Sequence, residues 1–413
     1  MEALIERCCG LDVHQATVVA CLLIGVAGQK PQKEVRTFGT MQDDLKQLCQ
    51  WLLQHGCTHV AMESTGVYWM PVYEALEGHF QLVVGNAQHI KNVPGRKTDV
   101  KDSEWIADLL RHGLIAKSFV PPEAIRELRD LTRYRRKLTE AQAAERNRLQ
   151  RLLETADVKL ASVASDVLGV SGRLMLRALI EGQSTPAQMA ELARGMLRRK
   201  LPELGRALCG RLTDNDRFLL KMQLDRVEQI EADISKLDER IEQQLKPYQE
   251  QHERLTQIPG VDRVTAAVML AELGADMNVF PTAQHAAAWA GLAPGNNESA
   301  GKRKGGKSRK GNVHLKTALV QAAVAASRKK GSYLKAKYWK VKARRGAKRA
   351  AMTVAHKILV VGYHMLLHGT DYADLGESYQ DDKVLSRTRR SLVRQLEGLG
   401  FQVTLNKKQQ LAA

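Results

Sequence analysis

The chain has 413 residues and a formal net charge of +18, from 63 basic and 45 acidic residues. A hydrophobic content of 44% supports packed cores, and the excess of positive charge is typical of proteins that bind a polyanion, most simply nucleic acid. We find no apolar run of membrane-spanning length and no signal peptide, which argues against a membrane or secreted protein.

The six cysteines form no CxxC pair and no Cys/His spacing typical of zinc. We therefore expect a reducing, cytoplasmic setting without disulfides or zinc. A chain of this length is expected to contain two or three domains. Their predicted ranges are 1–120, 121–250, 251–370 and a tail at 371–413.

The first 120 residues carry a β meander followed by alternating helix and strand. The predicted strands are 8–13, 16–24, 35–38, 59–63 and 80–84, and the predicted helices are 41–55, 67–76 and 99–111. This order is the ribonuclease-H-like pattern, so we predict an α/β domain of that type. In such a domain, an acid near the first strand, one at the fourth strand and more on a late helix converge at the end of the sheet.

Four carboxylates occupy these places: Asp12, Glu63, Asp99 and Asp102. Asp99 and Asp102 are three residues apart, so they face one side of one helix. Clustered carboxylates repel one another, and a hard divalent ion such as Mg²⁺ relieves that repulsion. Taken singly, each acid is better explained as a helix cap or a solvated strand end. Together they predict a Mg²⁺ site, with Mn²⁺ as an alternative, of the kind that acts on phosphodiesters.

The middle of the chain predicts a coiled coil. Two polar helical tracts, at 123–160 and 216–246, carry apolar stripes with spacings of three and four. They could pair with each other or across protomers. Between them, residues from about 161 to 213 form an interrupted helical insertion, which would lie at the tip of the coiled coil. It carries Arg198, Arg199 and Lys200, which either contact nucleic acid or form a solvated face.

The C-terminal domain is predicted to be mainly helical. The stretch 255–267 resembles a helix-hairpin-helix, in which backbone N–H groups at a helix N-terminus grip a phosphate. It departs from that motif at Asp262, where a glycine is usual, so a DNA contact and a plain helical turn both remain open. We also expect helices at 351–367 and 384–396.

Residues 301–350 contain 18 lysines and arginines and no acid. Such a segment predicts contacts with a phosphate backbone, with Tyr333, Tyr338 and Trp339 available for stacking. The alternative is a solvated face. The candidate nucleic-acid-binding residues are Lys302, Arg303, Lys304, Lys307, Arg309, Lys310, Lys316, Arg344, Arg345, Lys348 and Arg349.

Ser299 lies in a Gly-rich polar loop just before this basic segment. A nucleophilic serine needs a neighbouring base, a lowered pKa or a metal. The local sequence offers none of these, so by itself it describes an ordinary loop serine.

Four stretches nevertheless resemble the insertion-sequence transposase family that includes the Piv-type pilin-segment invertases. Some members of that family are called bridge-RNA-guided recombinases. The resemblance covers about the first 115 residues and roughly 250–367. The stretches that carry it are 10–14, 62–69, 97–102 and 291–312.

The resemblance implies a RuvC-like domain that binds Mg²⁺ through Asp12, Glu63, Asp99 and Asp102. It also implies that Ser299 is the nucleophile, with Ser308 as the fallback. The site would be composite, with the serine of one protomer meeting the carboxylates of another in a homodimer or tetramer. Recombination would pass through a covalent phosphoserine link and a Holliday junction. A non-coding guide RNA would pair with donor and target double-stranded DNA, and the protein would be a cytoplasmic, nucleoid-associated bacterial enzyme.

Two other interpretations stay open. A Mg²⁺-dependent nuclease or Holliday-junction resolvase would use water as its nucleophile and form no covalent adduct. A non-catalytic nucleic-acid-binding protein would tolerate Asp12→Ala or Glu63→Ala, but leaves the placement of the acids unexplained.

Overall fold

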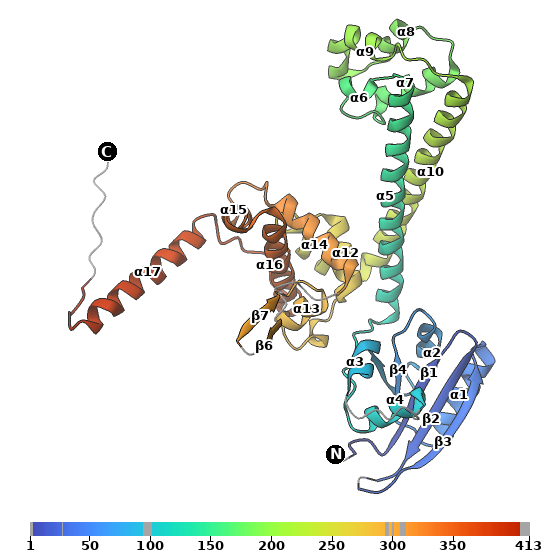
Figure 1. Ribbon diagram of the computed structural model, residues 1–413, viewed down its shortest axis with the longest axis vertical. Helices are drawn as coiled ribbons and strands as arrows, with labels where there is room; N and C mark the ends of the chain where they lie inside the picture. The colour runs from blue at the N-terminus through green and yellow to red at the C-terminus, as the bar shows by residue number, and fades with distance from the viewer. Residues whose placement is uncertain are drawn as a thin grey trace. The chain divides into compact units, whose positions relative to one another are not determined.

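The computed structural model describes residues 3–26, 28–93, 101–293, 297–299, 301–305 and 311–404, with the backbone alone for 88, 92, 297–299, 302–305 and 380–388. The chain divides into two compact units, Met1–Val120 and Pro121–Ala413. The first unit contains a five-stranded sheet, and the described part of the second is helical apart from one small hairpin (Figure 1).

The sheet of the first unit has the strand order β3-β2-β1-β4-β5. The first three strands pair antiparallel, whereas β4 pairs parallel with β1 and β5 pairs parallel with β4. This mixed sheet with its helices confirms the predicted ribonuclease-H-like class. The strands are β1 (Arg7–Val13), β2 (Thr17–Ile24), β3 (Gln32–Gly39), β4 (His59–Glu63) and β5 (Gln81–Gly85).

Alternation along the strands creates a core on each face of the sheet. Cys9 and Leu11 of β1 belong to the core that includes buried residues of α1 (Gln42–Gln54) and α2 (Trp69–Leu76). On the opposite face, Cys8 packs in the core formed with α4 (Asp102–Arg111). The sequence did not predict the short helix α3 (Ala87–Asn92) on this second face.

The second unit begins with two long helices that pair within the chain. Helices α5 (Glu123–Thr155) and α10 (Asp214–Leu245) lie side by side and antiparallel (Figure 1). The side chain of Arg135 binds Asp238, and Gln142 Nε2 donates to Glu231 Oε1 at 2.9 Å. The two predicted stripes therefore pair with each other in the described structure.

Short helices pack at one end of this pair in a core of their own. Leu149 and Leu153 of α5 meet Leu220 and Leu224 of α10 in the same cluster as Leu176 of α7. The helices are α6 (Leu160–Val163), α7 (Val170–Glu181), α8 (Pro186–Glu191), η1 (Gly195–Lys200) and α9 (Leu201–Ala207).

Most of the remaining helices pack around α16 (Ala347–His368), whose Val354, Ala355, Ile358 and Leu359 are fully buried. Among the described residues, only α16 is long and apolar enough to cross a membrane, which corrects our expectation that no segment reaches that length. Half of the segment is buried inside the protein, as in a core helix. The other elements are η2 (Lys246–Tyr248), α11 (Gln249–Thr256), α12 (Arg263–Leu273), η3 (Met277–Val279), α13 (Ala283–Trp289), α14 (Val313–Ala326), α15 (Tyr333–Arg345) and α17 (Tyr379–Gly398).

Candidate functional site

Three of the four predicted carboxylates lie on one face of the sheet. Leu11 of β1 pairs with Met62 of β4, so Asp12 and Glu63 are the next residues on two adjacent parallel strands. Because Leu11 and Met62 belong to the core on the α1 side, alternation turns Asp12 and Glu63 toward the opposite face. Asp102 is the first residue of α4, which packs on that opposite face.

Gly10 determines how closely α4 approaches this face. A Cβ atom at Gly10 would lie 2.3 Å from the backbone nitrogen of Ala107 and 2.3 Å from the carbonyl oxygen of Ser103. Only a residue without a side chain permits this contact between β1 and the helix. Gly10 thereby brings the first turn of α4, and Asp102 with it, close to the end of β1.

The charges of these acids affect one another. Burial raises the pKa of the Asp12 carboxyl above its ordinary value, and the negative charges of Asp102 and Glu63 raise it further, while His14 opposes them. His14 Nε2 lies 3.2 Å from Asp12 Oδ2, and the Thr65 hydroxyl donates to Glu63 Oε1. We did not predict the His14 contact, although His14 lies in the same short stretch as Asp12.

These oxygens have the chemistry that a hard divalent cation prefers. The pKa of Asp12 is raised mainly by burial and to a lesser extent by the charges of Asp102 and Glu63, which a cation would neutralise. No three His, Cys, Asp or Glu side chains in the described ranges are close enough to form a ready metal cage. The fourth predicted acid, Asp99, lies outside the described residues. The donor types therefore fit a divalent ion, and Asp12, Glu63 and Asp102 are the described residues that could hold it.

The predicted nucleophile, Ser299, lies on a hairpin that the sequence did not predict. Strand β6 (Asn297–Ser299) pairs antiparallel with β7 (Lys302–Gly305), and Ser299 is opposite Lys302 in the register. Three predicted nucleic-acid-binding residues are thus on the partner strand: Lys302, Arg303 and Lys304. Four other predicted residues of this loop lie outside the described part of the chain: Lys307, Ser308, Arg309 and Lys310.

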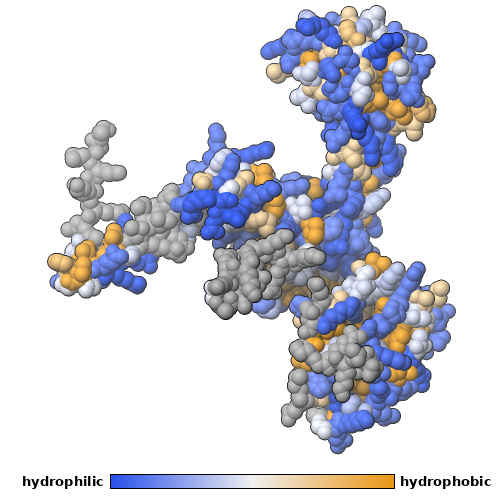
Figure 2. Space-filling model, in the orientation of Figure 1, coloured by the Kyte–Doolittle hydropathy of each residue, from blue (hydrophilic) through white to orange (hydrophobic). Residues whose placement is uncertain are grey.

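Four further basic residues gather at the corner between α15 and α16. Arg344 and Arg345 end α15, and Lys348 and Arg349 lie in the first turn of α16. All four are exposed, and Figure 2 shows a strongly hydrophilic surface over α15. Lys316 lies apart from them on α14.

The predicted stacking platform is only partly present. Tyr333 and Tyr338 are 6% and 7% exposed, so their rings belong to the core and are not available to bases. This corrects the expectation for both tyrosines, because their face of α15 packs inward. Trp339 is 49% exposed, and Lys342 Nζ lies 4.0 Å from the centre of its ring.

The structure of residues 255–267 favours a plain helical turn over a DNA-binding helix-hairpin-helix. Asp262 caps α12 by accepting a hydrogen bond from the Thr265 N–H at 2.7 Å, so its carboxylate occupies the place where a phosphate would bind. Gly260 has a positive φ of 86°, and a Cβ there would lie 2.2 Å from the Ala322 carbonyl oxygen of α14. The turn therefore packs against α14.

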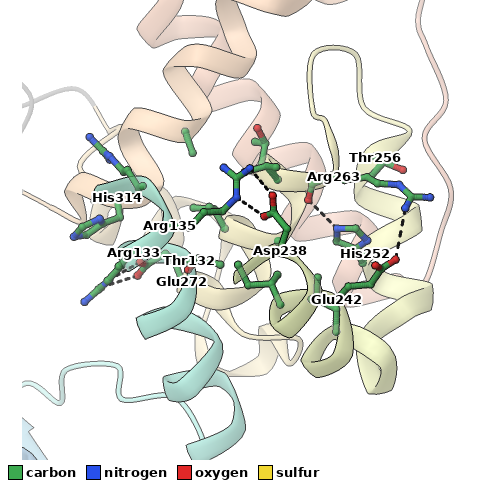
Figure 3. A pocket seen from close by; sticks show the side chains of 18 of the residues that line it. Thr132, Arg133, Arg135, Asp238, Glu242, His252, Thr256, Arg263, Glu272 and His314 are labelled. Carbon is green, nitrogen blue, oxygen red and sulfur yellow. Dashed lines mark hydrogen bonds and ion pairs between the residues drawn. The ribbon is translucent and has the colours of Figure 1, made fainter. Parts of the chain in front are cut away.

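A buried acid that sequence reasoning missed lies at the base of the helix pair. Glu272 of α12 is fully buried and accepts two hydrogen bonds from Arg133 of α5, at 2.8 and 2.9 Å. It borders a cavity of about 950 Å³ between α5, α10, α11, α12 and α14, which His314 also lines (Figure 3). In the sequence, Glu272 could have been noticed as the single acid within the otherwise mostly apolar sequence of α12.

Family comparisons agree with the geometry. A model described as a transposase, for the DEDD domain of IS110 elements, matches residues 9–156, and a model described as the transposase IS116/IS110/IS902 family matches 252–339. A Pseudomonas aeruginosa protein named "Probable family 20 transposase" is 26% identical over 275 residues, which is 65% of this chain and 71% of that protein.

A ribonuclease-H-like sheet with carboxylates beside its central strands is typical of metal-dependent enzymes that act on the phosphodiester bonds of nucleic acids. The chain belongs to the IS110 family of transposases. Its DEDD domain implies the use of a divalent metal, and the activity implies that it binds DNA.

Proposed function

We propose that this transposase is a site-specific recombinase of an insertion sequence, which cuts and rejoins donor and target DNA with Ser299 as nucleophile. Asp12, Glu63, Asp99 and Asp102 would hold Mg²⁺, or Mn²⁺ in its place. The observation that carries this proposal is the common sheet face of Asp12, Glu63 and the start of α4. The family membership supports extending the site to Ser299.

The chain's residues have separate tasks in this reaction. Ser299 Oγ loses its proton and bonds to the scissile phosphorus, while the bond from phosphorus to a sugar oxygen breaks and that oxygen takes up a proton. A phosphodiester is thereby conserved, so religation needs no external energy source. When bound, the metal stabilises the charge that develops on the phosphate. The exposed corner of Arg344, Arg345, Lys348 and Arg349 holds the DNA or RNA backbone.

We further propose that the catalytic site is composite and the enzyme a homodimer or tetramer. Ser299 of one protomer would act with the carboxylates of another, and a non-coding guide RNA would pair with donor and target. Mixing Ser299→Ala protein with Asp102→Ala protein tests this arrangement. Recovered activity in the mixture is the expected result, whereas an inactive mixture of two folded, associating variants would exclude the composite site.

The test of the main proposal is covalent trapping. The protein is incubated with Mg²⁺, RNA transcribed from the flanks of the element and labelled donor and target DNA, and the products are separated on a denaturing gel. We expect a protein–DNA adduct that Ser299→Ala and Asp102→Ala both abolish. Cleaved DNA without an adduct, unaffected by Ser299→Ala, would instead support a nuclease or junction resolvase that uses water.

A further inference from the structure

The two ends of the loop that carries Ser299 contact each other, at residues 289–291 and 311–312, which we call the base of the loop. The Asn312 N–H, just before α14, donates to the carbonyl oxygen of Trp289 at the end of α13, at 3.2 Å. Beside this bond, a Cβ on Gly311 would lie 2.3 Å from the backbone nitrogen of Gly291. The two ends of the segment from 292 to 310 are therefore held together, with Ser299 between them.

Asn312 also connects this base to the buried acid of α12. Its Oδ1 accepts the Leu315 N–H at 3.0 Å and caps α14, which leaves Nδ2 free to donate elsewhere. That donor binds Glu272 Oε2 at 2.6 Å. The cap fixes the direction of the amide, so the bond to Glu272 has a defined geometry.

The same carboxylate binds α5. Arg133 donates to both oxygens of Glu272, and Arg129 Nε lies 3.2 Å from Glu272 Oε2. Arg129 also donates to the carbonyl oxygens of Ala271 and Glu272, at 3.1 and 2.9 Å. In Figure 3, Arg133 and Glu272 face each other beside His314. Since Glu272 is fully buried, water does not compete for these bonds.

We propose that Glu272 is a positioning residue, which fixes the base of the Ser299 loop to helix α5 and so sets the position from which the serine acts. The inference rests on the proposed function for its catalytic consequence. It assigns a role to a residue 27 positions before the nucleophile, in a helix with no other acid. The chemistry depends on such placement, because a shift of about 1 Å can cost about a hundredfold in rate.

Three variants test the contact. Asn312→Asp keeps an oxygen that can cap α14 but places a second carboxylate against that of Glu272. The two negative charges repel each other, which should push the base of the loop away from Glu272. Glu272→Gln combined with Asn312→Asp removes the repulsion between the two carboxylates and keeps one negative charge beside the arginines, but the new amide N–H weakens the bonds to Arg133 and Arg129. Asn278→Asp is the matched control, because Asn278 Nδ2 donates to Asp276 Oδ1 at 2.8 Å on an exposed turn.

The first readout is the rate of adduct formation at saturating DNA, measured beside DNA affinity and thermal unfolding. We expect Asn312→Asp to slow the reaction about tenfold to a hundredfold at unchanged DNA affinity. The double variant should react faster than Asn312→Asp alone, and Asn278→Asp should match the wild type. A wild-type rate in Asn312→Asp, with Ser299→Ala inactive, would overturn the inference.

The second readout does not depend on the chemistry. Amide hydrogen exchange over residues 289–292 and 313–316 should be faster in Asn312→Asp than in the wild type, and slower in the double variant than in Asn312→Asp. If the wild type forms no adduct, the proposed function fails, whereas this comparison still tests whether the contact between Glu272 and Asn312 holds the two ends of the loop together. Should Asn312→Asp not fold, Asn312→Ser keeps a cap without the repulsion, and unchanged exchange in it would overturn the contact's role.

Discussion

Gly10 of β1 and Ser103 of α4 are in direct backbone contact: a Cβ at position 10 would lie 2.3 Å from the Ser103 carbonyl oxygen. The contact lies one residue from Asp102 and two residues from Asp12. It links the packing of the sheet to the placement of the proposed metal ligands.

Gly10→Ala should therefore damage both stability and activity. The added methyl meets backbone atoms, which cannot rotate away, so we expect a loss of about 1–3 kcal/mol or more in the free energy of unfolding. Urea unfolding measures it. Gly205→Ala is the control, because nothing lies within 4 Å of a Cβ there. That substitution should leave stability unchanged or raise it by up to about 1 kcal/mol, and equal losses in both variants would contradict the packing explanation.

The buried acid and an exposed acid should differ in their effect on stability. Glu272→Ala leaves Arg129 and Arg133 without their carboxylate, and removing one partner of a buried ion pair costs about 3–5 kcal/mol. Asp238 of α10, which is 45% exposed, also pairs with an arginine of α5. Asp238→Ala should cost only about 0–1 kcal/mol. Chemical denaturation of both variants compares them, and similar losses would show that Glu272 is not a structural anchor.

How far the sequence predicted the molecule depends on the kind of signal. The strands of the first unit were predictable because buried apolar residues cluster there, and β4 has its predicted bounds, His59–Glu63. The hairpin β6–β7 was missed because the residues of its strands are polar or glycine, so its sequence lacks the alternating apolar residues by which a strand is recognised. The sequence did not decide which helix pairs with α5, because two helices with similar apolar stripes can pair within one chain or between two chains. Glu272 was missed because its role depends on Arg133, 139 positions away.

The stability of the second unit should fall in mild acid. Burial lowers the pKa of His314 below its ordinary value, and Arg133, Arg136 and Lys137 lower it further, while Glu272 opposes them. As the pH falls through about 6.5, the unfolded chain therefore gains a proton before the folded protein does, and the free energy of unfolding decreases.

His314→Gln should remove part of this loss between about pH 7 and pH 5.5. His356, whose pKa burial also lowers, keeps its own contribution in that variant. Urea midpoints across this range provide the measurement. An unchanged pH dependence in His314→Gln would mean that the environment of His314 does not favour its neutral form.

DNA affinity should depend steeply on salt, because bound phosphates release their counterions. Replacing Arg344 and Arg345 with alanine should lower the slope of log affinity against log salt by about one for each phosphate that the protein no longer neutralises. The matched control replaces Lys221 and Lys236, exposed lysines of α10 that pair with Asp225 and Asp233. Equal slopes for the two double variants would argue against a nucleic-acid surface at the α15–α16 corner.

The identity of the nucleophile is tested most directly by locating the nucleotide within the trapped adduct. Trypsin cleavage after Lys302 and Lys307 separates Ser299 from Ser308, and mass spectrometry of the peptides identifies the modified one. We predict a phosphodiester-linked nucleotide on the peptide that ends at Lys302, at Ser299. A nucleotide on Ser308 would contradict Ser299 as the nucleophile, and a nucleotide on a residue other than serine, or cleaved DNA with no modified peptide, would contradict the serine recombinase mechanism.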